Sequence, residues 1–247
     1  MKLSITDYVK KGGYLLYVHP PLWRQIKSKL FKLVKKYNLI YLNINNEKCG
    51  KKLFKCSTRF DYYLLQKTEY NGKTIIIDEY NKDNIINLTE WEFIPNGYFK
   101  KIKKLISSDI KQHIISDRSN YGADKKHVSN KNVGEDDIFK YPVIYSIYKD
   151  KSLQIRYSTH TNNGHFGLPK VIFTPNLGLN NIVDENGQYG LTQWVMAICD
   201  KKENLKDITK IFKNTEFKEI LKCIKFGMYY NSNILKLFNK DFWREFI

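Results

Sequence analysis

The chain has 247 residues, 42% of them hydrophobic, so it can bury one large core or two smaller ones. This composition excludes wholesale disorder, and no apolar run is long enough to span a bilayer. The net charge of +17, with 18 Tyr and 14 Phe residues, favours a nucleic-acid partner, because basic side chains pair with phosphates and aromatic rings stack on bases. The alternative is an AT-rich genome, which raises the Lys content without any need for nucleic acid.

The cysteines and histidines indicate neither a disulfide framework nor a metal site. No C-x-x-C pair occurs, and the histidines form no ligand cluster with a cysteine. We therefore expect no structural metal, reduced thiols and an intracellular protein. The sequence shows no signal peptide, and no membrane partner is expected.

Helices and strands are predicted to alternate over the first 90 residues. Residues 1–11 are expected to end a helix that Gly12-Gly13 stops, and 22–37 to form a basic amphipathic helix. Tyr14–Val18 has the short apolar pattern of a buried strand. Further strands are expected at Leu39–Ile44, Asp61–Leu65 and Thr74–Asp78, the last at a sheet edge. This alternation predicts an α/β fold.

The pattern changes near residue 91. A turn-rich junction leads to a helix over Phe99–Ile106, and a polar, mobile loop is predicted over residues 116–137. Short strands then follow, and after them two helices over 202–213 and 215–224. The expected strands are Val143–Tyr148, Leu153–Tyr157 and Val171–Thr174. We therefore divide the chain into a first domain, 1–90, and a second, α+β domain, 91–247.

The order of residues 12–67 carries a family resemblance. Gly12-Gly13 and an apolar strand lead into His19-Pro20-Pro21-Leu22-Trp23-Arg24, and Phe54-x-x-x-Thr58 precedes the strand after Phe60. This order resembles the second half of the catalytic domain of a site-specific adenine-N6 DNA methyltransferase. The resemblance implies a partial Rossmann-like methyltransferase sheet over 1–90, with Arg24 and Lys27 close to the DNA.

The resemblance also assigns a role to Phe54. Chemistry on the amine of a paired adenine requires the base to leave the duplex, and an aromatic face then replaces its lost stacking. By resemblance, Phe54 is this base-stacking residue. The alternative is that Phe54 is a core residue beneath its loop.

The sequence lacks the motifs that would complete the enzyme. Such an enzyme transfers a methyl group from S-adenosylmethionine, using a cofactor-binding glycine loop and an Asn-Pro-Pro-Tyr loop. The nearest matches are His19-Pro20-Pro21-Leu22, without the amide and the aromatic residue, and Leu177-Gly178-Leu179, with a single glycine. We therefore assign no catalytic residue and expect the chain alone to be inactive and to bind no cofactor. A separate chain carrying the missing motifs is an expected partner.

A second resemblance lies in the C-terminal half. Asn163–Phe173 and Asp184–Trp194 resemble the target-recognition region of large adenine methyltransferases and fused restriction–modification enzymes. This resemblance implies that polar side chains in these loops read double-stranded DNA. For each residue, turn chemistry between strands is the alternative. The expected contacts are Lys170, Gln188, Thr192 and Gln193.

Three functions follow from these patterns. The first is a DNA adenine methyltransferase polypeptide that lacks its front half, whether as a split subunit or a truncation. The second is a non-catalytic, sequence-specific DNA-binding module. The third is the rear part of a fused restriction–modification enzyme.

Overall fold

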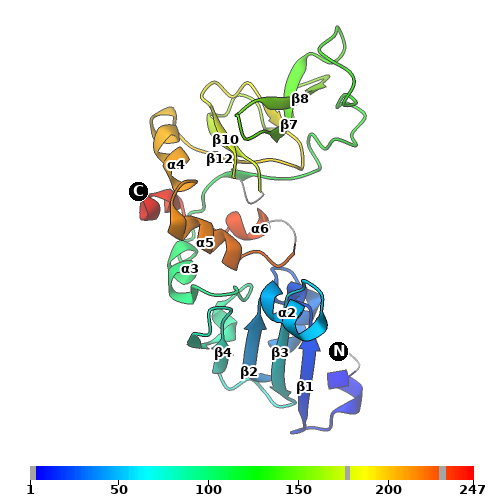
Figure 1. Cartoon of the computed structure of the whole chain (residues 1–247), viewed down its shortest axis with the longest axis vertical. Helices are drawn as coiled ribbons and strands as arrows, with labels where there is room; N and C mark the ends of the chain where they lie inside the picture. The colour runs from blue at the N-terminus through cyan, green and yellow to red at the C-terminus, as the bar shows by residue number, and fades with distance from the viewer. Residues whose placement is uncertain (1–3, 176–178, 228–231) are drawn as a thin grey trace. The chain divides into compact units, whose positions relative to one another are not determined.

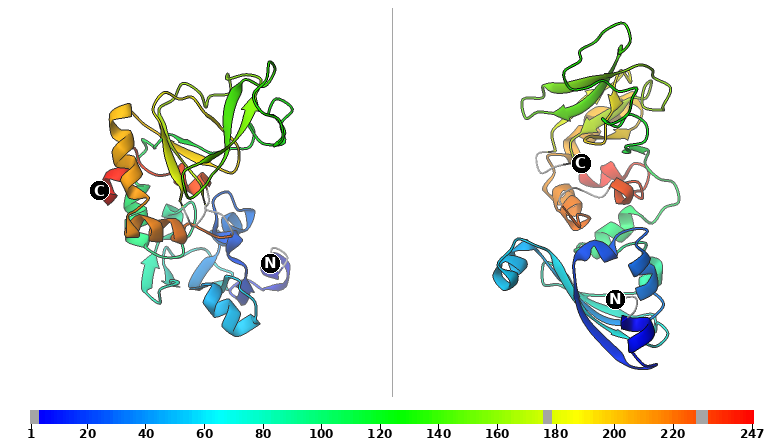
Figure 2. Two further views of the ribbon diagram at one scale, coloured as in Figure 1. Left: turned by 45° about the horizontal axis from the view of Figure 1, so that its top comes forward. Right: turned by 90° about the vertical axis from the view of Figure 1, so that its right-hand side faces the viewer.

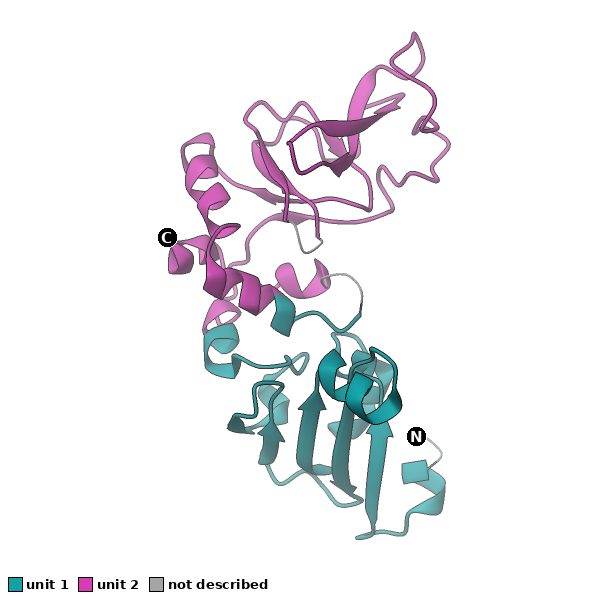
Figure 3. Ribbon diagram, in the orientation of Figure 1, with its two compact units in different colours: residues 1–103, 222–228 teal, residues 104–221, 229–247 magenta. Residues whose placement is uncertain are grey.

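The computed structural model describes residues 4–175, 179–227 and 232–247, which form two compact units of mixed helices and sheets. The first unit comprises residues 1–103 and 222–228, and the second comprises 104–221 and 229–247 (Figure 3). The predicted α/β class therefore holds in its general form. The predicted boundary after residue 90 falls inside the first unit, where Trp91, Phe93 and Ile94 are buried.

The first unit is built on a five-stranded sheet in the order β1-β3-β2-β4-β5 (Figure 1). β3 runs antiparallel between β1 and β2, and β4 is parallel to β2. The carboxyl ends of β1, β2 and β4 consequently meet at one edge of the sheet, called here the carboxyl edge. The strands are β1 (Tyr14–His19), β2 (Asn38–Asn45), β3 (Phe60–Gln66), β4 (Thr74–Ile77) and β5 (Asp83–Ile86).

The predicted helix over 22–37 is interrupted. A 3-10 turn, η2 (Pro21–Arg24), is followed by α1 (Lys29–Val34). Lys27 between them adopts a left-handed backbone with φ of 62°, and Ser28 caps α1 by accepting the Phe31 N–H. The other helices of this unit are the π-turn η1 (Ser4–Tyr8), α2 (Glu47–Phe54), η3 (Leu88–Glu90) and most of α3 (Phe99–Leu105).

β1 is an edge strand, whereas its apolar run predicted a buried one. Its residues alternate between exposed and half-buried, and Tyr14, Leu16 and Val18 are 60%, 70% and 55% exposed. An apolar run shows that a segment is extended, but it does not show how many neighbours the strand has. Within the described residues, β1 pairs with β3 alone.

The second unit contains two smaller sheets and a group of helices. One sheet has the order β10-β9-β12-β6 and the other β11-β7-β8. All three strands predicted here are present, at β7 (Tyr141–Ile147), β8 (Leu153–Ser158) and β9 (Lys170–Phe173). The remaining strands are β6 (Ile114–Ile115), β10 (Asn181–Asp184), β11 (Gly190–Leu191) and β12 (Met196–Cys199). The helices are η4 (Lys202–Asn204), α4 (Leu205–Ile211), α5 (Thr215–Cys223), α6 (Ser232–Leu235) and η5 (Phe242–Phe246).

Gly50 in α2 allows the helix to approach the following loop. A Cβ atom at this position would overlap the carbonyl oxygen of Thr58, which is backbone and cannot move aside. We expect Gly50→Ala to lower the free energy of unfolding by about 1–3 kcal/mol, the usual cost of overpacking. Gly227→Ala, in the same unit with nothing within 4 Å, is the matched control. Urea unfolding followed by tryptophan fluorescence measures both, and equal stability of the two variants would contradict the close approach.

Candidate nucleic-acid interface

Polar residues collect at the carboxyl edge of the five-stranded sheet. β1 ends at His19, β2 at Asn45, and β4 is followed by Asp78 and Glu79. The start of β3 lies here too, because His19 pairs in register with Asp61. In open α/β sheets, ligands bind outside the carboxyl ends of the strands. This edge is therefore the candidate ligand-binding site of the first unit.

A buried ion pair between Arg24 and Asp61 occupies the interior of the edge. Arg24 Nε lies 2.7 Å from Asp61 Oδ2 and Nη2 lies 3.0 Å from Oδ1, with exposures of 1% and 0%. Trp23 Nε1 also donates to Asp61 Oδ2, at 2.8 Å. The guanidinium further donates to the carbonyl of Ile94 at 2.7 Å and to Asn96 Oδ1 at 2.9 Å. Arg24 therefore holds the 94–96 segment to the sheet, and its expected contact with DNA is not supported.

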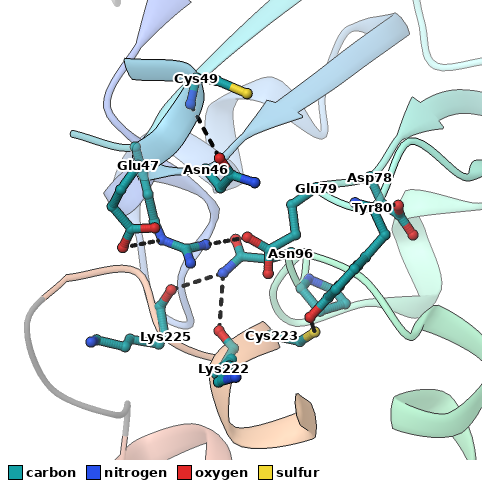
Figure 4. A network of polar contacts seen from close by, with 12 residues as sticks. Asn46, Glu47, Cys49, Asp78, Glu79, Tyr80, Asn96, Lys222, Cys223 and Lys225 are labelled. Atoms are coloured by element: carbon teal, nitrogen blue, oxygen red, sulfur yellow. Dashed lines mark hydrogen bonds and ion pairs between the residues drawn. The ribbon is translucent and has the colours of Figure 1, made fainter. Parts of the chain in front are cut away.

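A second guanidinium, that of Arg59, joins two carboxylates at the same edge (Figure 4). Its Nε donates to Glu47 at 2.8 Å and its Nη1 to Glu79 at 2.7 Å. Burial raises the pKa of Glu79 in spite of Arg59. Burial is also the largest single effect on Glu47, but its hydrogen bonds and the charges of Arg59 and Lys225 together outweigh it, so the pKa of Glu47 is lowered. Both carboxylates are committed to Arg59, so neither is placed as a free general base.

The remaining polar groups of the edge are also used to hold backbone. Asp78 Oδ1 accepts the N–H groups of Tyr80 and Lys82, closing the turn after β4. Asn96 donates to the carbonyl of Lys225 at 2.8 Å, and its own N–H donates to the carbonyl of Cys223 (Figure 4). These interactions hold the loops at the edge in place. They give structural roles to the carboxylates of Asp61, Glu47, Asp78 and Glu79.

α2 presents the exposed part of the edge. Asn46 caps its start by accepting the N–H groups of Lys48 and Cys49, and Lys55 ends it with φ of 60°. The helix projects beyond the ends of the strands (Figure 2, right). Its last turn carries a run of exposed basic and apolar residues: Lys51, Lys52, Leu53, Phe54 and Lys55.

Phe54 is exposed to 45% of its surface, so the structure does not support a core role for it. Its ring packs edge-on against Phe60, with centroids 4.9 Å apart and planes at 79°. Phe60 is 7% exposed and fixes one side of the Phe54 ring, while the rest remains accessible. Lysines beside an accessible aromatic ring are the combination that binds unpaired nucleotides. From the sequence we expected Phe54 to lie in a loop. We assigned no role to these lysines, although the sequence contains the run Lys-Lys-Leu-Phe-Lys.

The residues expected to read DNA in the second unit are mostly internal. Lys170, at the start of β9, is fully buried and lies 2.7 Å from Asp184 on the paired strand β10. Its ammonium also donates to the carbonyls of His165 and Leu168. The expected contact of Lys170 with phosphate is therefore not supported, because this charge is neutralised inside the unit.

The other expected contacts differ in exposure. Thr192 is 1% exposed, and the Gln193 side chain is half-buried and accepts the N–H of Ala123 at 2.9 Å. The structure therefore favours a structural role for these two residues over an expected contact with DNA. The side chains of Gln188 and Lys27 are exposed, so these two remain available to a ligand.

A cavity close to the carboxyl edge is rich in charged side chains. This cavity, of about 340 Å³, lies beside the turn after β4 and is lined by Asp78, Tyr80, Asp83 and several lysines. Lys82, Lys100 and Lys101 all line it, and Asp78 is already bonded to its own turn. The three lysines outnumber the two aspartates in this lining, so the cavity favours an anionic group.

No protein-family model matches this sequence, and no curated protein matches it at a significant level. Over the residues described, no group of three or more His, Cys, Asp and Glu side chains is placed to hold a metal ion. None of the helices in the described ranges is both long and apolar enough to cross a membrane. The nearest glycine-loop match, at 177–179, lies mostly outside the described residues.

His165 makes the stability of the second unit depend on pH. Its Nδ1 accepts the Leu191 N–H at 3.1 Å, and burial, the largest cause, lowers its pKa to about 4. The unfolded chain, with a histidine pKa of about 6.5, takes up a proton that the folded chain refuses. Stability should therefore fall as the pH is lowered from about 6.5 to about 4, by up to about 3 kcal/mol.

His165→Gln removes this titration, and urea unfolding at several pH values compares it with the wild type. The wild type should be the more stable at pH 7, and the difference should narrow toward pH 4. A difference that stays constant over this range would show that His165 is not the titrating group. Titration of the imidazole by NMR gives an independent reading.

Proposed function

We propose that this chain is the DNA-binding rear part of a site-specific adenine-N6 DNA methyltransferase, and that it holds the flipped adenine while another polypeptide carries out methyl transfer. The observation that carries the proposal is the last turn of α2. There an accessible Phe54 ring, backed by Phe60, stands among Lys51, Lys52 and Lys55 at the carboxyl edge. The proposed substrate is double-stranded DNA.

The division of roles follows from the groups at this edge. The lysines of α2 neutralise phosphates, and Phe54 replaces the stacking that a base loses when it leaves the duplex. Arg24 and Arg59 tie the surrounding loops to the sheet, so the Phe54 ring stands on a rigid support. S-adenosylmethionine is proposed as the methyl donor, bound by the other polypeptide, since this sequence has no match to the cofactor-binding glycine loop.

The arrangement of the first unit supports the Rossmann-like part of the proposal. β1 and β2 run in the same direction and are joined through α1, which is the crossover connection of α/β sheets. The second unit is proposed as the target-recognition part. Gln188 is its proposed contact with DNA, and Lys27 is the proposed contact beside η2.

A non-catalytic DNA-binding module is the second candidate. The observation that favours it is the pairing of Asp61, Glu47 and Glu79 with guanidinium groups, which leaves them with structural roles. The two candidates differ in one measurement. Methyl transfer that depends on both this chain and a second polypeptide supports the first, and DNA binding without any such dependence supports the second. The rear part of a fused restriction–modification enzyme would show DNA cleavage as well.

The lysines of α2 should carry a measurable share of the DNA affinity. We expect the triple variant Lys51→Gln, Lys52→Gln, Lys55→Gln to bind duplex DNA more weakly and with a shallower salt dependence. The slope of log K against log salt should fall by about 0.9 for each phosphate that the variant no longer neutralises. Fluorescence anisotropy at several salt concentrations measures both quantities.

The matched control removes three exposed lysines from the opposite end of the sheet. Lys10 and Lys11 precede β1, and Lys73 precedes β4, so all three lie at the amino ends of parallel strands. Their triple Gln variant has the same net charge as the α2 variant. If both variants lost affinity equally, the overall charge would explain binding and α2 would not be the interface.

Phe54 should contribute to binding only when a base is unpaired. We expect Phe54→Ala to lose the preference for a duplex with one unpaired adenine over a fully paired duplex, by about ten- to a hundredfold, since stacking on a base is worth roughly 1–3 kcal/mol. Phe54→Trp keeps a π-face and should keep the preference. Leu53→Ala, at a neighbouring side chain that is 63% exposed, is the control. Early melting of Phe54→Ala with parallel loss of both duplexes would show that Phe54 is structural.

A further inference from the structure

The two faces of the five-stranded sheet are covered unequally. Strand register places Leu16, Leu64, Tyr41, Ile75 and Ile85 in one row that crosses all five strands. Within this row, called here the apolar row, Leu16 is 70% exposed, Ile75 38% and Ile85 65%. Side chains of paired residues point to the same face of a sheet, so the row is a continuous apolar surface.

The adjacent row on the opposite face behaves differently. There Tyr63, Leu42 and Ile76 are paired in register and each is fully buried. Trp23 of η2 packs on Tyr63, with ring centroids 4.9 Å apart. Sheets that contain parallel strands normally have both faces covered. The exposed apolar row therefore resembles the face of a sheet that is normally covered by a second layer of structure.

The edge beside this face is open as well, since no strand of the described residues pairs with the outer side of β1. β1 is regular over all six of its register pairs, and it contains neither proline nor Lys, Asp or Glu. An antiparallel neighbour uses the N–H and C=O groups of every second residue, so the alternate groups of β1 point away from β3. Sheet edges are usually blocked by charges, proline or a bulge. The other edge, β5, is shorter and begins with Asp83 and Asn84.

The charge of the chain decides what can bind there. Two copies of a chain with a net charge of +17 repel each other, which disfavours a symmetric dimer through β1. Lys10 and Lys11 are exposed just before β1, and Lys73 is exposed just before β4. A segment lying along β1 and across the apolar row would meet these lysines at one end. The complementary segment is therefore apolar on one side and acidic.

We propose that β1, labelled in the sheet of Figure 1, and the apolar row bind a separate polypeptide, which adds an extended, acidic strand beside β1 and covers the row with its apolar side chains. The identity of this polypeptide as the chain that carries the cofactor loop rests on the proposed function. The mode of binding is strand addition, in which main-chain hydrogen bonds supply affinity and alternate side chains supply specificity.

The experiment uses the full chain and a short synthetic peptide in which valine and glutamate alternate. The control peptide has the same residues but is N-methylated at alternate positions, which removes backbone donors without changing charge. Fluorescence anisotropy should show binding of the first peptide and at least about tenfold weaker binding of the second. Equal binding of both peptides would reduce the interaction to charge alone, and no binding of either would also overturn the proposal.

Variants locate the interaction on the sheet. Leu16→Lys should weaken peptide binding by about tenfold or more, because it places a charge within the apolar row, where the valine side chains would have to bury it. Ile110→Lys is the control, since Ile110 in the second unit is also 70% exposed. Equal binding by both variants would overturn the assignment to β1. A dimer of the chain alone that Leu16→Lys abolishes would show a second copy to be the partner and would overturn it as well.

The two sets of variants separate this proposal from the proposed function. Leu16→Lys should leave the affinity for duplex DNA unchanged, and the triple Gln variant of the α2 lysines should leave peptide binding unchanged. A variant that loses only peptide binding therefore tests the binding of a partner at β1. A variant that loses only DNA binding tests the proposed DNA interface at α2.

Discussion

The arrangement of the first unit depends on the guanidinium of Arg24. It is fully buried, and it contacts Asp61 on β3, the carbonyl of Ile94 and the side chain of Asn96. Removing one partner of such a pair leaves an uncompensated charge in the interior and costs about 3–5 kcal/mol. Asn96 in turn donates to the carbonyls of Lys222 and Lys225. Directly and through Asn96, the Arg24 side chain therefore links β3, residues 94–96 and residues 222–225. The Arg24–Asp61 pair fixes the positions of these segments, and the burial of apolar side chains supplies most of the free energy of folding.

The same arrangement affects which charges the carboxyl edge exposes to solvent. Asp61, Glu47 and Glu79 form ion pairs with Arg24 and Arg59, which are themselves largely buried. The exposed charges in the last turn of α2 are those of its lysines. The charge that this edge exposes to solvent depends on which charged side chains are paired in the interior. The net charge of the chain alone does not reveal this pairing.

The elements whose signal is local were predictable from the sequence. Leu39–Ile44 and Asp61–Leu65 lie within β2 and β3, because apolar runs and β-branched residues act at short range. The prediction missed α2, whose clearest local signal was the Asn46 cap, and β5, whose Asp83 and Asn84 are unfavourable in strands. For the candidate site, Phe54 was singled out through its resemblance to a family pattern, and its role stays a prediction. The burial of Arg24 and Lys170 was not predicted, because their partners lie 37 residues away on β3 and 14 residues away on β10, and composition cannot reveal such pairs.

The return of residues 222–228 to the first unit affects how the chain can be divided. Asn96 finds two of its acceptors on Lys222 and Lys225, and Phe226 lies against the Arg24 guanidinium at 5.1 Å. A fragment that ends at residue 103 would therefore expose a buried amide and one side of a buried cation. In terms of modular architecture, each unit is discontinuous, because residues 222–228 of the first unit lie between the two segments of the second, 104–221 and 229–247. No single cut in the chain would accordingly release both units intact.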